Sequence, residues 1–128
     1  MIFLLDTHAL IWFVEDDEKL PDSLRNILGN KKNNIFISIG TLWEIAIKIS
    51  LEKLVINKTF EEVLHLVKSN GFGILPISED HLSVLLKLPF IHRDPFDRIL
   101  ASQSLAGGFV FVSKDIVFDS YKVKRLWK

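Results

Sequence analysis

The chain has 128 residues, no cysteine, and equal numbers of acidic and basic residues, so that its formal net charge is zero. This length fits one domain covering residues 1–128, and an apolar fraction of 48% is enough for a buried core. The composition excludes disulfides, iron–sulfur clusters and thiolate zinc sites, and it provides no overall basic charge for nucleic acid.

No segment has the character of a targeting or membrane-spanning sequence. The apolar start lacks the basic residues of a signal peptide, and Asp6 interrupts it at once. The longest stretch without a charged residue or histidine, Ile99–Ser113, has 15 residues and contains a glycine pair, which is too short to span a bilayer. We therefore expect a soluble cytoplasmic protein that does not associate with membranes.

Strand and helix patterns alternate along the first half of the chain. A continuous apolar run predicts a buried strand, and periodic apolar residues behind a capping residue predict a helix. The predicted elements are a strand at Ile2–Leu5, a helix at Thr7–Val14, a helix from Pro21 to about Gly29, a strand at Ile35–Ile37 and a helix at Ile39–Ile49 that Ser38 caps.

The same alternation continues through the second half. The predicted elements are a helix at Phe60–Ser69, a strand within Gly71–Pro76, a helix from Ser78 to about Lys87, a helix from Asp94 to about Ala106, a strand at Phe109–Val112 and an edge strand at Val123–Leu126. Such an order predicts an α/β fold in three layers, with helices on both faces of a central, mostly parallel sheet. In this architecture the site lies beyond the carboxyl ends of the strands.

Four carboxylates are expected to meet at that edge of the sheet. Asp6 directly follows the first strand, and Asp115 follows the strand at Phe109–Val112 by two residues. Asp97 lies in the first turn of one helix, and Glu44 lies early in the helix after the second strand. Four acidic residues from separate segments are therefore expected to converge on one point.

Convergent carboxylates point to a divalent metal site. Like charges packed together raise one another's pKa values, and a hard cation such as Mg²⁺ or Mn²⁺ removes the repulsion. One or two such ions activate water and stabilise the leaving oxygen in the hydrolysis of a phosphodiester. The pattern thus favours a metal-dependent nuclease.

Each acidic residue also has a structural alternative. Asp6 is a candidate N-cap, and Glu44 has the spacing for an ion pair with Lys48. The negative charge of Asp97 could interact favourably with the helix dipole, and Asp115 could be an ordinary turn residue. Asp119 lies close enough to be the alternative fourth acid.

Four segments carry a resemblance to a known family. Leu4–Leu10, Leu42–Lys48, His92–Arg98 and Val112–Asp115 occur in the order and spacing of a PIN-domain ribonuclease, and the whole chain resembles the VapC-type toxins of toxin–antitoxin pairs. The resemblance implies a PIN-like fold with metal ligands at four positions, which are Asp6, Glu44, Asp97 and, at the more variable fourth position, Asp115.

The resemblance also gives roles to residues beside the acids. It implies that Thr7 and Ser38 orient carboxylates or waters, and that Ser113 stands where such proteins often have threonine. Arg98 is expected either to contact phosphate or to neutralise the acids. Asp94 precedes Pro95 and is expected to act mainly as a helix N-cap.

The function implied by the resemblance is endonucleolytic cleavage of RNA with Mg²⁺ or Mn²⁺, typically of structured RNA such as transfer RNA. It further implies inhibition by a small antitoxin protein and a homodimer. Trp12, Phe13 and Trp43 are candidates for the antitoxin groove, although the apolar neighbours of Trp43 favour a position in the core.

Three other functions are alternatives, and two of them lack a residue that they require. A receiver domain needs an aspartate after a middle strand, but no aspartate lies between Asp22 and Asp80. A haloacid-dehalogenase-like phosphatase needs a second aspartate where His8 stands. The remaining alternative is a catalytically silent PIN-fold module that binds RNA or serves as a scaffold.

Overall fold

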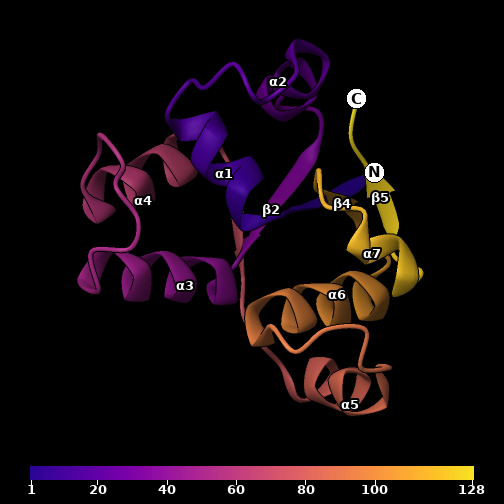
Figure 1. Cartoon of the computed structure of the whole chain (residues 1–128). Helices are drawn as coiled ribbons and strands as arrows, with labels where there is room; N and C mark the ends of the chain where they lie inside the picture. Colours follow the sequence, from indigo (N-terminus) through magenta and orange to yellow (C-terminus); the bar gives the residue numbers. More distant parts are fainter.

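A five-stranded parallel sheet lies at the centre of the computed structural model, which describes residues 1–128 (Figure 1). The strands follow the order β3-β2-β1-β4-β5, and every neighbouring pair is parallel. Their bounds are Ile2–Leu5 for β1, Asn34–Ser38 for β2, Gly73–Leu75 for β3, Val110–Val112 for β4 and Lys124–Leu126 for β5. The predicted sheet is confirmed, and it is parallel throughout.

Seven helices connect the strands. They are α1 (Thr7–Val14), α2 (Asp22–Gly29), α3 (Ile39–Ser50), α4 (Phe60–Ser69), α5 (Glu79–Lys87), α6 (Pro95–Gly107) and α7 (Val117–Ser120). All except the four-residue α7 were predicted. The end of α6 depends on Gly108, whose φ of 66° places it in the left-handed region that glycine adopts without strain.

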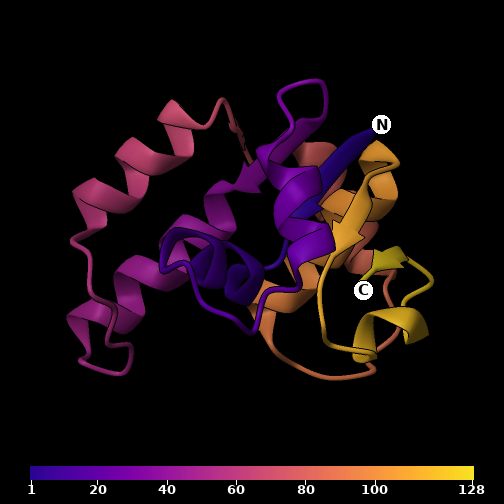
Figure 2. The same ribbon diagram turned by 90° about the horizontal axis from the view of Figure 1, so that it is seen from above.

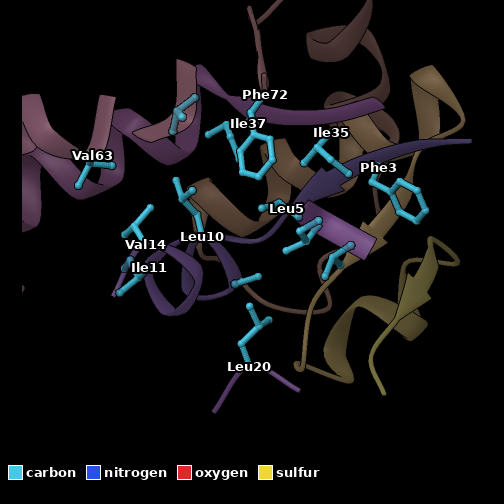
Figure 3. Close-up of a cluster of buried hydrophobic side chains, with 14 of the residues drawn as sticks. Phe3, Leu5, Leu10, Ile11, Val14, Leu20, Ile35, Ile37, Val63 and Phe72 are labelled. Atoms are coloured by element: carbon cyan, nitrogen blue, oxygen red, sulfur yellow. The ribbon is translucent and has the colours of Figure 1, made fainter. Parts of the chain in front are cut away.

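The two faces of the sheet carry separate hydrophobic cores, because side chains alternate along β1. Phe3 and Leu5 join the larger cluster, which contains buried residues of α1, α2, α3 and α4 (Figure 3). Leu4 belongs to the second cluster, together with Leu100 of α6 and Phe118 of α7. The alternation therefore divides the helices between the faces and produces the three layers.

The second layer of helices is seen below the sheet in Figure 1, where α5 lies against α6. Figure 2, viewed from above, shows α4 at the outer edge of the molecule, away from α7 and β5. None of the helices is long and apolar enough to cross a membrane.

The position predicted for Trp43 is wrong. Leu42 and Ile45 are buried as expected, but the side chain of Trp43 is 58% exposed and Ala46 is also exposed. Helix α3 packs one face on the core, so residues between the buried positions point outward. The Trp43 ring contacts the edge of Phe96 on α6, with ring centroids 5.3 Å apart.

Candidate active site

A pocket of about 320 Å³ opens beyond the carboxyl ends of β1 and β4. It brings together all four predicted acidic residues, although they come from four separate segments of the chain. Its lining is Asp6, Thr7, His8, Ala9, Trp12, Glu44, Lys48, Asp94, Asp97, Lys114 and Asp115. Nine of these eleven residues are polar or charged, so the pocket suits an ionic ligand better than an apolar one.

Asp6 is placed by the register of the sheet. Leu5 of β1 pairs with Val112 of β4, so the residues that follow these two, Asp6 and Ser113, are neighbours. Ser113 Oγ donates to Asp6 Oδ2 at 2.7 Å, and the Thr7 amide donates to Asp6 Oδ1 at 2.7 Å. Asp6 therefore caps α1, as its structural alternative predicted, and lines the pocket as well.

Burial dominates the electrostatics of Asp6. The residue is only 7% exposed, and desolvation raises the pKa of its carboxyl above the usual value. The hydrogen bonds from Ser113 and Thr7 oppose this shift, and the charge of Glu44 adds to it. The pocket thus holds a carboxylate whose negative charge is poorly compensated.

Glu44 reaches the pocket from α3. Thr7 Oγ1 donates to Glu44 Oε1 at 2.7 Å, and the Lys48 ammonium lies 2.6 Å from Oε2. The ion pair with Lys48 that the spacing suggested therefore exists, and both of its residues line the pocket. Hydrogen bonding to Glu44 raises the pKa of Lys48.

Asp97 enters from the opposite layer of helices. Asp94 caps α6 by accepting from the amides of Phe96 and Asp97, which fixes the first turn of that helix. Burial raises the pKa of Asp97 to about 7, and the charges of Asp6 and Asp94 add to the shift. The Asp6 carboxylate is therefore close enough to disfavour ionisation of Asp97.

His92 holds the carboxyl of Asp97, a contact that the sequence analysis did not predict. His92 Nε2 lies 3.1 Å from Asp97 Oδ2, and His92 Nδ1 lies 2.7 Å from the hydroxyl of Tyr121. The signal that could have found His92 is its place five residues before Asp97 in the same quoted segment.

Asp115, the fourth of the predicted metal ligands, also lines the pocket. It is exposed, and its backbone amide donates to Ser113 Oγ at 3.0 Å. Asp119 does not line the pocket, because Arg125 holds its carboxylate with two hydrogen bonds at 2.9 and 3.1 Å. Geometry therefore favours Asp115 over Asp119.

Ser38 caps a helix, and the expectation that it orients water stays a prediction. Its hydroxyl accepts from the Gly40 amide at 2.9 Å and caps α3, and it makes no hydrogen bond to an acidic residue. Ser113 and Thr7, in contrast, bond directly to Asp6 and Glu44. Of the three predicted hydroxyls, two orient carboxylates and one caps a helix.

Arg98 faces away from the acids, contrary to expectation. Its guanidinium is buried and donates to the carbonyl of Pro89 at 2.8 Å, with longer contacts to the carbonyls of Leu85 and Leu88. It also lies 4.4 Å from the ring centroid of Phe90. These partners lie at the end of α5 and just after it, so Arg98 ties α5 to α6.

We therefore expect Arg98→Met to lower the free energy of unfolding by about 2–3 kcal/mol, because the hydrogen bonds from a buried charged group to backbone carbonyls are lost. Urea denaturation at neutral pH measures this change. Arg93→Met is the matched control, since Arg93 is exposed, and it should leave stability unchanged. An Arg98→Met protein of unaltered stability that fails to bind phosphate would support the original expectation.

The donor set fits a divalent cation, although no three acidic or histidine side chains converge in this arrangement on one shared ion. Carboxylate oxygens are the ligands that Mg²⁺ and Mn²⁺ prefer. The Lys48 ammonium balances the charge of Glu44. The raised pKa values of Asp6 and Asp97 indicate that these two carboxyls lack a comparable positive partner. A cation bound beside these carboxylates would balance that charge.

The parallel sheet and the acidic pocket define an α/β domain whose site lies at the carboxyl edge of its central strands. The sequence matches the family described as PIN domain over residues 3–124. The chain therefore belongs to the PIN domain family.

Solved structures share the fold at low sequence identity. The chain is similar to one in the crystal structure of VapBC2 from Rickettsia felis bound to a promoter DNA fragment, with a TM-score of 0.77, 19% identity and full coverage of both chains. DNA-bound VapBC from Salmonella typhimurium gives a TM-score of 0.67 and FitAcB from Neisseria gonorrhoeae gives 0.62, each at 20% identity over 98% of this chain and 96% of the other. A comparison with curated protein sequences gives no match.

Proposed function

We propose that this protein is an endoribonuclease that requires Mg²⁺ or Mn²⁺ and acts as the toxin of a toxin–antitoxin pair. The observation that carries the proposal is the meeting of Asp6, Glu44, Asp97 and Asp115 in one polar pocket. Membership of the PIN domain family supports the nuclease activity. Structured RNA, such as transfer RNA, is the substrate class that we propose.

The four carboxylates would hold one or two ions against the scissile phosphate. A bound ion would supply a water of lowered pKa and would neutralise charge on the phosphodiester. Ser113 keeps Asp6 oriented, and Thr7 does the same for Glu44 through hydrogen bonds of 2.7 Å. Lys48 and Lys114, which also line the pocket, have the charge to contact phosphate oxygens.

The proposed protein partners are a small antitoxin and a second copy of the chain. Support for the antitoxin comes from the nature of the similar structures, which are the VapBC and FitAcB assemblies named above. The DNA in two of these structures belongs to those complexes, and we propose no DNA site on the present chain.

Incubation of the purified protein with RNA should give defined cleavage products when Mn²⁺ or Mg²⁺ is added, and none in EDTA, because the acids bind phosphate only through a cation. Sequencing of the RNA ends would locate the cut. RNA that binds without being cut, under every metal condition, would instead identify a silent RNA-binding module.

A further inference from the structure

A second hollow begins where the acidic pocket ends. His8 and Trp12 line both spaces, so the two lie next to each other on either side of these side chains. The second hollow has a volume of about 320 Å³ and lies between α1 and the segment that links α3 to α4. Its lining is His8, Ile11, Trp12, Glu15, Asp17, Lys19, Leu54, Val55, Ile56 and Asn57.

The second hollow has a mixed polar and apolar lining and is open to solvent. Half of its lining is hydrophobic, and the side chain of Val55 is 89% exposed. Glu15 Oε1 accepts from the Asn57 amide at 2.8 Å, which holds the linking segment beside α1. The linking segment therefore forms a fixed wall of the second hollow.

The boundary between the two spaces is an aromatic ledge formed by His8 and Trp12. Their ring centroids are 5.7 Å apart, and the indole of Trp12 also meets Trp127 edge-on at 5.8 Å. Lys19 places its ammonium 5.9 Å from the centroid of the Trp12 ring. Aromatic rings held in this way are the surfaces on which unpaired bases stack.

Charged residues lie on both sides of the aromatic ledge, and they differ between the two spaces. Lys48 and Lys114 belong to the acidic pocket, where a cation and a phosphate would sit. Glu15, Asp17 and Lys19 line the second hollow, where the Lys19 ammonium lies 3.9 Å from the Asp17 carboxylate. Carboxylate oxygens at this place accept hydrogen bonds from the amino groups of bases. The second hollow therefore offers a base both aromatic rings and hydrogen-bond acceptors.

We propose that the second hollow is a subsite for the base of one unpaired nucleotide, stacked on Trp12 and His8, next to the phosphate that is cut. This inference rests on the proposed function for the position of the phosphate. A base must leave its helical stack to enter, so the site selects loops and single strands over duplex RNA.

Fluorescence anisotropy of a labelled single-stranded RNA tests the subsite. The Asp97→Asn protein is used because it should bind without cutting, and Trp12→Leu and His8→Ala are added to it separately. Leucine keeps an apolar side chain against the core, and His8 is exposed, so both proteins should fold. Trp12→Leu should weaken binding about tenfold, the loss expected for one unstacked base.

A second arm removes the base instead of the ring. One abasic position, moved along the RNA, should weaken binding about tenfold at a single place, and the loss should vanish in the Trp12→Leu protein because the two changes remove the same contact. Trp43→Leu is the matched control, since this exposed tryptophan lies outside both spaces. It should leave the affinity unchanged.

The outcomes separate the subsite from the proposed function. Equal affinities for all variants and for abasic RNA would overturn the subsite, and would leave the hollow for another occupant such as an antitoxin segment. Cleavage by the otherwise unmodified protein is measured independently, so loss of the subsite leaves the nuclease proposal intact. Binding that depends on Trp12 in a protein that never cuts would support the subsite and contradict the nuclease.

Discussion

Asp97→Asn is expected to reduce RNA cleavage by more than about a hundredfold, which exceeds the loss caused by residues that merely support metal ligands. The reason is that Asp97 contributes a half-buried carboxylate to the pocket and lies within electrostatic reach of Asp6. Initial rates of cleavage at saturating Mn²⁺ measure the effect. Circular dichroism of the same protein should show an unchanged fold, because asparagine keeps the size of the side chain.

Asp119→Asn is the control for this result. Asp119 is an exposed aspartate near the pocket, but its carboxylate pairs with Arg125 and does not line the pocket. Cleavage should therefore be retained. Full activity in the Asp97→Asn protein would rule out the proposed mechanism, and equal losses in both variants would show that the effect is not specific to the pocket.

Without divalent metal, the free energy of unfolding should fall as the pH rises from 5 to 8. Burial raises the pKa of Asp97 to about 7, so the folded protein holds a proton there that the unfolded chain releases near its ordinary value of 3.8. The resulting stability is complete below pH 4 and is lost as the pH passes 7. The loss between pH 5 and pH 8 should be about 2–3 kcal/mol, measured by urea denaturation in EDTA.

Asp97→Asn should remove most of this pH dependence and should make the metal-free protein more stable than the wild type at pH 8. Mg²⁺ at a hundred times its dissociation constant should restore about 2.7 kcal/mol to the wild type by binding the folded state. Asp119→Asn should keep the wild-type slope, because Arg125 lowers the pKa of Asp119 and so moves its titration below this range. A flat profile for the wild type would contradict the charge deficit inferred for the pocket.

The fold could be predicted because its signals are local. The apolar run of β1 and the capping residues Ser38 and Asp94 mark element types and starting points without reference to distant residues. Helix α7 was missed because four residues carry too little periodicity to distinguish a helix from a turn. Trp43 was misplaced because an apolar residue inside an apolar helix gives no sign of which face it occupies.

The acids of the pocket could be predicted because strand ends in a parallel sheet share one edge. Orientation could not be predicted, since it depends on contacts between remote layers. Arg98 follows Asp97 in sequence, yet it turns toward the carbonyls at the end of α5. The contact of His92 with Asp97 and Tyr121 likewise depends on how α6 and α7 pack against the sheet.

Because Asp6 both caps a helix and lines the pocket, it is a poor marker for telling active from catalytically inactive members of such a family. Its carboxylate both starts α1 and lines the pocket, so a chain that abandoned catalysis would still need an oxygen acceptor there to keep its first helix. Asp115 is exposed, and its side chain supports only the short α7 through the Val117 amide. Drift away from activity should therefore appear first at Asp115, and the presence of an aspartate at position 6 is a poor indicator that a relative still cuts RNA.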